Sequence, residues 1–220
     1  MRIFFLFVFF LFTLVAVCQT KNEIVKFDSV YCSSSIDELR SSYSFNKEIP
    51  SEYELSILMA LSHFPELDSA NIKFKETKIK TTLNARPTFW STIFNKKGNR
   101  KYIVRINSKK TDSIVKLSEV SFNARIGLFG HEFCHFIDYN EKGFGQLLKT
   151  LTSYSNKSKR EEYEKEIDAM TIEKGLGWQL YEWSNYVLTT SNASEEYKKY
   201  KSETYLKPGE IEELTIKTSH

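Results

Sequence analysis

The feature that most restricts how this chain can fold is a long, mostly apolar run at residues 121–139, SFNARIGLFGHEFCHFIDY. The run shows no period-two alternation and is too long for a single strand, so we expect a largely buried helix. Gly127 and Gly130 in its interior lower helix stability, and they favour a fold in which something approaches the helix backbone closely. The sequence therefore predicts that HEFCH, residues 131–135, lies on a buried helix.

HEFCH combines two histidines and a glutamate in a pattern suited to metal chemistry. Positions four apart share one helix face, with Cβ atoms about 5–6 Å apart, so His131 and His135 can direct imidazole nitrogens at one ion. Glu132 lies one position round the helix, where it can hold a zinc-bound water and accept its proton. Chance explains the motif poorly, because roughly 0.007 matches are expected for this composition. The alternative is a buried cluster of hydrogen-bonded His and Glu side chains without metal.

A catalytic zinc site needs a third protein ligand and an open fourth position. The segment YEKEIDAM, residues 163–170, offers one, because Glu164 and Asp168 are four apart and share a helix face. Glu164 can therefore complete the metal site while Asp168 accepts the outward N–H of a ligating histidine. Glu166 points about 160° away from Glu164 around the same helix, so it cannot belong to that face.

Other acidic residues could supply the third ligand. Glu161 and Glu162 remain alternatives, and all these acids could instead form a solvated helix face. Glu141 lies six residues after the second histidine, but the HExxHxxGxxH arrangement needs a glycine where this chain has Asp138. We therefore prefer Glu164 and exclude Glu141.

HEFCH followed on a later helix by the ExxxD pattern resembles the zincin metallopeptidases, in particular the gluzincin branch. The resemblance covers about a quarter of the chain and rests on these two short motifs. It implies Zn²⁺ bound by His131, His135 and Glu164, general-base catalysis by Glu132, and support of His131 by Asp168. Members of this branch often add a residue that stabilises the oxyanion, for which no motif is present here.

The resemblance also sets expectations for the rest of the cleft. Tyr181 or Tyr186, after the ligand helix, could stabilise the oxyanion. Zincins commonly place a strand along the substrate cleft before the motif helix, and residues 101–107 occupy that place. Its free edge could pair with an extended peptide, although an ordinary sheet edge is an equal alternative.

The expected fold class is α+β and zincin-like, with a small, mainly antiparallel sheet packed on the HExxH helix and further helices toward the C-terminus. Residues 49–65 predict a helix that opens with a capping box at Ser51 and Glu54. Period-two alternation predicts strands within residues 71–83 and 90–107, with a hairpin turn at residues 97–99. Further helices are expected over residues 160–175, 177–188 and 194–206.

The N-terminus predicts export. One arginine precedes a run from Ile3 to Val17 that is apolar apart from Thr13, which is typical of a secretory signal peptide over residues 1–18. Cleavage near Cys18 would place the protein in the periplasm or outside the cell, while a lipidated or uncleaved N-terminus would hold it at a membrane. Residues 19–46 are polar and Ser-rich and predict a poorly ordered lead-in, followed by a single zincin-like domain over residues 47–220.

Composition restricts the partners. The 41% hydrophobic and 27% charged residues suit one globular domain, and the +3 formal charge is spread rather than gathered, so nucleic acid is not an expected partner. Signal cleavage would leave Cys32 and Cys134, which could pair in an oxidising compartment. Cys134 lies inside the motif, however, and a small buried side chain is the preferred interpretation.

These observations together predict an exported zinc-dependent metallopeptidase, which hydrolyses a peptide or protein substrate by Glu132-assisted attack of a zinc-bound water. The alternative is a secreted zincin-fold binding module that keeps the metal and has lost catalytic activity. A membrane-held maturation or quality-control factor is a third interpretation. Membrane attachment is expected only through the N-terminus.

Overall fold

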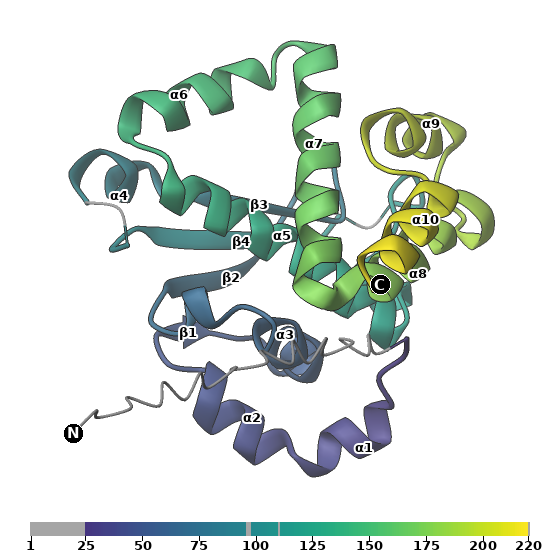
Figure 1. Ribbon diagram of the computed structural model, residues 1–220, viewed down its shortest axis with the longest axis horizontal. Coiled ribbons are helices and arrows are strands. Elements are labelled where there is room, and N and C mark those ends of the chain that lie inside the picture. Colours follow the sequence, from purple (N-terminus) through teal and green to yellow (C-terminus); the bar gives the residue numbers. More distant parts are fainter. Residues whose placement is uncertain (1–24, 96–97, 110, 220) are drawn as a thin grey trace, which may run out of the picture.

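The computed structural model describes residues 25–95, 98–109 and 111–219. Within them, a four-stranded sheet is surrounded by helices in an α+β arrangement (Figure 1). The predicted signal peptide and His220 lie outside the described residues. No helix in the described part of the chain is long and apolar enough to span a bilayer.

The sheet has the strand order β1-β2-β4-β3. β1 pairs with β2 and β2 with β4 in parallel, whereas β3 and β4 are antiparallel. The expectation of a mainly antiparallel sheet is therefore wrong. β4 returns to the direction of β2 because the chain reverses twice between them, once into β3 and once out of it. The strands are β1 (Lys47–Glu48), β2 (Asn71–Thr77), β3 (Leu83–Pro87) and β4 (Lys101–Asn107).

The predicted hairpin turn at residues 97–99 lies partly outside the described residues, and the segment expected to form the strand before it is helical. α4 (Phe89–Phe94) occupies most of the stretch expected to form the first strand of that hairpin. Its aromatic residues at positions 89, 90 and 94 are exposed rather than half-buried on a sheet. Gly98, with φ +83°, lies in the connection from α4 to β4.

α5 (Phe122–Glu141) packs against β3, α3 and two later helices (Figure 1). The predicted buried helix is confirmed, and it begins where the Ser121 side chain accepts a hydrogen bond from the backbone N–H of Ala124. Phe129 and Phe133 pack edge-on against Phe74 of β2, with ring centres 6.0 and 6.4 Å apart. The motif helix is therefore joined to the sheet through a continuous hydrophobic core.

The interior glycines of α5 lie where α8 (Gly177–Asn185) and the turn before it cross the helix. A Cβ atom at Gly127 would lie 2.3 Å from the Gln179 carbonyl carbon, and one at Gly130 would lie 2.4 Å from Leu176 Cδ1. The predicted close approach is confirmed. α7 (Lys157–Thr171) is followed by a π-helical turn in which Gly175 adopts φ +81°, the conformation expected of a glycine stop.

The contact at Gly127 predicts a large loss of stability for Gly127→Ala. The added methyl group would force α5 and α8 apart, and overpacking of this kind lowers the free energy of unfolding by about 1–3 kcal/mol or more. Gly145, in the first turn of α6 (Phe144–Ser153), is the matched control, because nothing lies within 4 Å of its Cβ position. Chemical denaturation of both variants measures the difference, and an unaltered midpoint for Gly127→Ala would contradict the close approach.

The lead-in expected to be poorly ordered contains two helices, α1 (Ser29–Ser34) and α2 (Ile36–Tyr43). Asp28 caps α1, since its carboxylate accepts two backbone N–H bonds. The Asn123 side chain of α5 bonds both the N–H and the C=O of Phe27, at 2.7 and 2.9 Å. These bonds span 96 residues, so no local pattern could indicate them.

The remaining predicted helices form with shifted ends. α3 (Glu54–Leu61) follows a 3-10 turn at Ser51–Tyr53 and ends before Pro65. Neither turn nor helix has a side-chain cap, so the predicted capping box is wrong. The last helices are α9 (Glu195–Thr204) and α10 (Pro208–Thr218), and α10 was not anticipated.

Candidate metal centre

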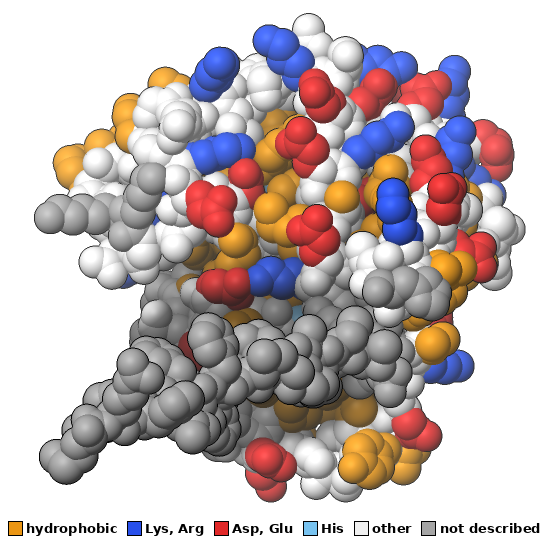
Figure 2. Space-filling view, in the orientation of Figure 1, with side chains coloured by type: hydrophobic (Ala, Val, Ile, Leu, Met, Phe, Trp, Pro, Cys, Tyr) orange, Lys and Arg blue, Asp and Glu red, His pale blue; other side chains and the backbone are white. Residues whose placement is uncertain are grey.

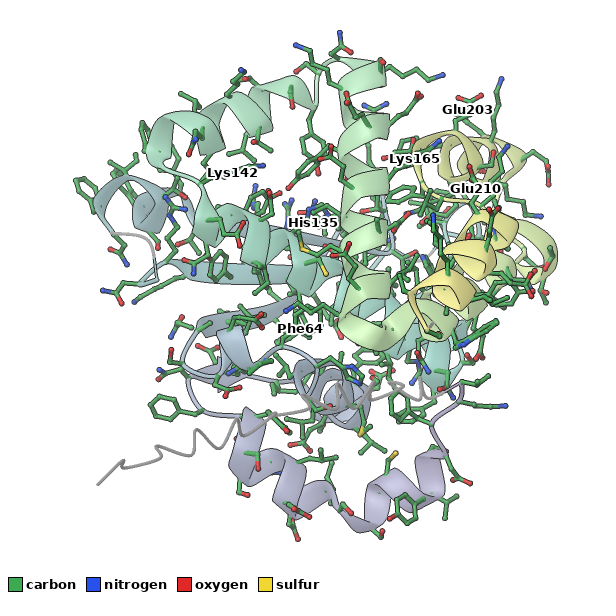
Figure 3. All side chains as sticks on the ribbon, in the orientation of Figure 1. Phe64, His135, Lys142, Lys165, Glu203 and Glu210 are labelled. Atoms are coloured by element: carbon green, nitrogen blue, oxygen red, sulfur yellow. The ribbon has the colours of Figure 1, made fainter. Side chains whose placement is uncertain are left out.

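The predicted site residues come from two helices that pack on one another, α5 and α7. His131, Glu132 and His135 lie in the middle of α5, and Glu164 and Asp168 lie one turn apart on α7. All five side chains are buried. Figure 3 shows His135 in the interior, where α5 passes behind α7. The structure therefore brings together the residues that the two motifs single out.

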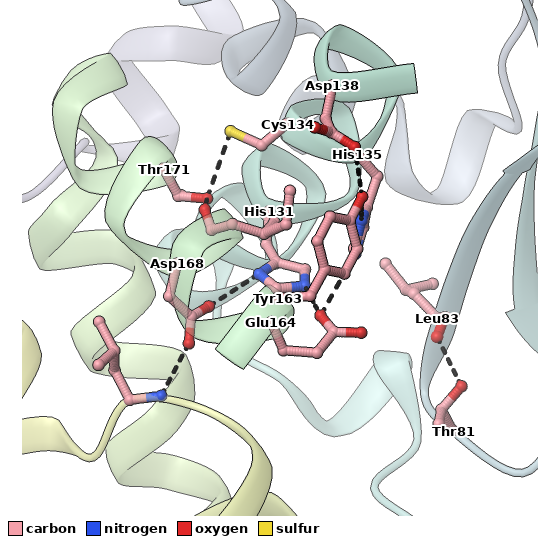
Figure 4. A network of polar contacts seen from close by, with 12 residues as sticks. Thr81, Leu83, His131, Cys134, His135, Asp138, Tyr163, Glu164, Asp168 and Thr171 are labelled. Atoms are coloured by element: carbon pink, nitrogen blue, oxygen red, sulfur yellow. Dashed lines mark hydrogen bonds and ion pairs between the residues drawn. The ribbon is translucent and has the colours of Figure 1, made fainter. Parts of the chain in front are cut away.

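Three ligand-type atoms converge between these helices (Figure 4). Glu164 Oε2 lies 3.2 Å from His131 Nε2 and 3.4 Å from His135 Nε2. One ligand atom from each of the three residues lies within 4.8 Å of the other two. Zn–N and Zn–O bonds of about 2.0–2.2 Å at tetrahedral angles place neighbouring ligand atoms about 3.4 Å apart. The distances from Glu164 Oε2 to the two Nε2 atoms therefore match those between neighbouring ligand atoms around one zinc ion.

Hydrogen bonding fixes the orientation of the His131 ring. Its Nδ1 lies 2.8 Å from Asp168 Oδ1, and the other Asp168 oxygen accepts the backbone N–H of Leu206 at 2.9 Å. Because an ionised carboxylate only accepts, the His131 proton belongs on Nδ1 and the lone pair on Nε2. The predicted partnership of Asp168 with His131 is present in the structure.

His135 is oriented through a tyrosine. Tyr163 donates its hydroxyl hydrogen to Asp138 Oδ2 at 2.6 Å, and the same hydroxyl lies 3.4 Å from His135 Nδ1. With its only hydrogen directed at Asp138, this hydroxyl can only accept from His135, which again leaves the lone pair on Nε2. Lys142 also donates to Asp138, at 2.7 Å, and holds that carboxylate in place.

The third ligand-type residue presents a single oxygen. Tyr154 donates to Glu164 Oε1 at 2.8 Å, while Oε2 is buried and lacks a hydrogen-bond partner within the described chain. With both imidazoles neutral, two lone pairs and this oxygen face one point without a donor between them. Burying three acceptors together is unfavourable unless a cation joins them. Two nitrogens and one carboxylate oxygen are a ligand set that catalytic Zn²⁺ takes, so the residues fit the ion.

The pKa shifts of the cluster without a metal also indicate that it favours a positive charge. When no ion is bound, a proton on His131 supplies the positive charge instead: burial lowers its pKa, but hydrogen bonds to Asp168 and Glu164 outweigh burial and raise that pKa to about 10. Burial would raise the pKa of Glu164, yet the charge of His135 and hydrogen bonds from both histidines hold it well below its usual range. Burial raises the pKa of Glu132, partly offset by the two histidines. The cluster therefore favours a bound positive charge.

A cleft of about 410 Å³ opens onto the cluster, and His131, Glu132, His135 and Glu164 all line it. Neither Tyr181 nor Tyr186 is among the described residues that line this cleft, so both suggestions for an oxyanion-stabilising residue are wrong. Both tyrosines follow α7 in sequence, but they lie on α8 and directly after it, away from the residues that line this cleft. The other walls come from β3, β4, α7 and the ends of α6 and α9, and include Ala85, Arg86, Arg105, Tyr154, Arg160 and Tyr205.

The alternative ligands lie elsewhere. Glu162 and Glu166 are exposed on α7, and Glu161 lies 3.6 Å from Lys157. Glu141 ends α5 and is exposed. None of these four belongs to the metal-type cluster found among the described residues.

The described part of the chain holds one further histidine, His63, and two cysteines, Cys32 and Cys134. His63 Nδ1 lies 2.9 Å from the Lys174 carbonyl oxygen, so this ring is hydrogen-bonded outside the metal cluster. Cys32 and Cys134 are both buried free thiols, which matches the preferred interpretation of Cys134.

Sequence reasoning missed the outer partners Tyr154, Tyr163 and Asp138. One signal was available for Asp138, which lies three residues after His135 and so shares its helix face. Tyr163 directly precedes Glu164, but only the crossing of α5 and α7 brings its hydroxyl to the His135 ring. Tyr154 ends α6, and nothing local indicates that it reaches Glu164.

Tyr163→Phe is expected to weaken zinc binding by about 10- to 100-fold, because loss of an outer hydrogen-bond partner frees the ligand ring and its tautomer. The matched control is Tyr102→Phe, since Tyr102 is buried on β4 and its hydroxyl has no hydrogen-bond partner in the described residues. Competition with a chromophoric chelator measures both affinities. Equal affinities for Tyr163→Phe and the native chain would remove Tyr163 from the site.

Searches against protein-family models, curated proteins and solved structures found no match.

Proposed function

We propose that this protein is a zinc-dependent metallopeptidase of the zincin type that hydrolyses peptide bonds. The observation that carries the proposal is the unpartnered Glu164 Oε2 facing two imidazole lone pairs, with Glu132 on the same cleft wall. Export through the N-terminal segment belongs to the same proposal. It stays a prediction, because residues 1–18 lie outside the described chain.

His131, His135 and Glu164 would hold the ion, which when bound supplies a Lewis acid that lowers the pKa of water and polarises a carbonyl group. Glu132 then takes a proton from the attacking water and delivers it to the leaving amine. Asp168 and Tyr163 keep the proton on Nδ1 of each histidine, so that both Nε2 atoms stay available.

Tyr205 takes the oxyanion role for which Tyr181 and Tyr186 were suggested. It lines the cleft, and its ring centre lies 5.6 Å from that of His131. Lys201 Nζ lies 3.9 Å from the centre of the Tyr205 ring, which holds the phenol against the site. A phenol hydroxyl at this position can donate to the developing carbonyl oxyanion.

The expected substrate-pairing strand was residues 101–107, but that strand is β4, which has neighbours on both sides. β3 is an edge strand of the sheet and lines the cleft. Thr82 O accepts from Asn107 N and Thr88 N donates to Lys101 O, so even-numbered residues bond toward β4. By alternation, the N–H and C=O of Ala85 point to the free edge. This supports pairing of an extended peptide with β3.

The proposal is tested with the purified full chain. Metal analysis is expected to give about one zinc per chain, and cleavage of casein or a peptide library should stop on chelation and return with added zinc. Zinc without cleavage would replace the peptidase with an inactive metal-binding module. A chain that neither carries nor takes up zinc would leave only a buried polar cluster.

A further inference from the structure

An apolar groove lies beside the metal cleft, between α4 and α6. Its volume is about 430 Å³, and six large apolar side chains line it: Phe89, Ile93, Ile103, Phe144, Leu148 and Leu151. Phe89 is 69% exposed and Phe144 and Leu148 are each 51% exposed. Figure 2 shows hydrophobic side chains gathered over α4 and α6. Contiguous exposed apolar surface of this kind marks a binding site.

The groove is continuous with the metal cleft. Arg86 and Leu151 line both cavities. β3 connects them, because Leu83 at its start lines the metal cleft and Pro87 at its end lines the groove. Four residues of extended chain span about 13 Å. A peptide paired with β3 would therefore pass from the metal centre into the groove.

Arginines line the metal cleft, and one of them, Arg86, also lines the groove. Arg86, Arg105 and Arg160 line the metal cleft, and no ion pair found within the described chain includes any of them. Asn84 Oδ1 accepts from Arg105 Nε and Nη2, at 3.2 and 2.6 Å, which fixes that guanidinium beside β3. Burial and the charge of Arg86 lower the pKa of Arg105, as expected where positive charges gather. The cleft therefore offers uncompensated cations to a carboxylate.

We infer that the cleft selects extended peptides that carry an acidic side chain close to the scissile bond and a large apolar side chain about four residues from it. The acidic side chain pairs with the arginines, and the apolar side chain fills the groove between α4 and α6. This inference names the substrate class and rests on the proposed function. A concave groove that continues a charged cleft fits one extended chain, whereas a bilayer needs a surface that it can lie against.

The test uses four labelled peptides with one common central sequence. The peptides differ in two features, in all four combinations. One feature is an aspartate next to the central bond, and the other is a phenylalanine four residues from that bond on each side. Fluorescence anisotropy with the zinc-loaded Glu132→Gln chain measures affinity, and the native chain measures kcat/KM. The phenylalanines are expected to improve both by about tenfold. The aspartate should improve them by about fivefold, with a gain that falls at high salt.

Two pairs of variants assign the preferences to residues. Leu148→Asp should remove the preference for phenylalanine, while Ile216→Asp on α10, at 46% exposure against 51% for Leu148, should keep it. Arg86→Gln should reduce the preference for aspartate, and Lys75→Gln on β2, with β4 between it and β3, should not. Thermal melting of each variant checks that the fold is retained.

Each outcome decides between the two proposals. Cleavage without either preference overturns the inference and leaves the peptidase. Binding preference without cleavage by the native chain overturns the peptidase and leaves a peptide-binding groove. A third outcome is that the chain self-associates or binds anionic lipid vesicles, that Leu148→Asp abolishes this binding, and that the four peptides bind equally well. This outcome would assign the groove to a second copy of the chain or to a membrane, and it would overturn the inference.

Discussion

Glu132→Gln is expected to abolish peptide hydrolysis while zinc stays bound. The substitution keeps the size of the side chain and removes the basic oxygen that takes the proton from water, so kcat should fall roughly a hundredfold to ten-thousandfold. Metal content should not change, because His131, His135 and Glu164 keep their positions. Initial rates on a quenched fluorescent peptide, with zinc measured on the same sample, give both quantities.

The control for this substitution is Glu141→Gln. Glu141 lies on the same helix and is exposed, so its loss removes one charge from α5 without touching the cleft. It should behave as the native chain. A Glu132→Gln variant that retains native activity would show that another group takes the proton, and the assignment of Glu132 as the base would be wrong.

Glu164→Ala is expected to lower zinc affinity by more than about a hundredfold. This is a larger loss than that expected for an outer hydrogen-bond partner such as Tyr163. The substitution removes the only carboxylate in the metal-type cluster of the described residues. Two imidazoles alone leave the ion with too few protein ligands. Zinc measured after dialysis should fall from about one per chain to near zero, and added zinc should no longer raise Tm, because ligand binding to the native state is what raises it.

Glu166→Ala is the matched control for the ligand. Glu166 lies two residues along α7 and is exposed, so it tests whether any loss of negative charge from this helix releases the metal. The control should keep zinc. Stoichiometric zinc in Glu164→Ala would place the third ligand elsewhere and remove the geometric basis of the site.

The two substitutions separate two properties of one cluster. Glu132→Gln is expected to lose activity with metal retained, and Glu164→Ala to lose both. In a binding module that keeps its metal, Glu164→Ala would still lower the zinc content. Glu132→Gln would have no effect on activity, because the native chain itself would be inactive. The pair therefore distinguishes the peptidase from its main alternative without knowledge of the natural substrate.

Short-range patterns predicted the parts of the site that lie on single helices. The spacing of His131 and His135, and that of Glu164 and Asp168, depends only on 3.6 residues per turn, so it could be predicted before the helices were placed. The interior glycines also indicated a close approach, although not which helix makes it. Gly127 proved to face the backbone of α8.

Sequence patterns gave wrong predictions of secondary structure in two segments. Residues 89–94 carry aromatic and β-branched side chains that suit a strand, yet they form α4 and expose those side chains beside the groove. Residues 29–43 read as a loose segment and form α1 and α2, held to α5 by bonds between Phe27 and Asn123. At α1 and α2, contacts with a residue far along the chain outweighed local preference.

Helical periodicity alone predicted that two helices each carry paired metal-type residues on one face, because periodicity is a property of neighbours in the chain. The tertiary structure was needed to show that Glu164 meets both imidazoles and that Tyr163 orients His135. It also decided that β3 rather than β4 offers its edge to the cleft. Those outcomes depend on how α5 crosses α7 and on which strand lies outermost, and both are set by packing between residues far apart in sequence.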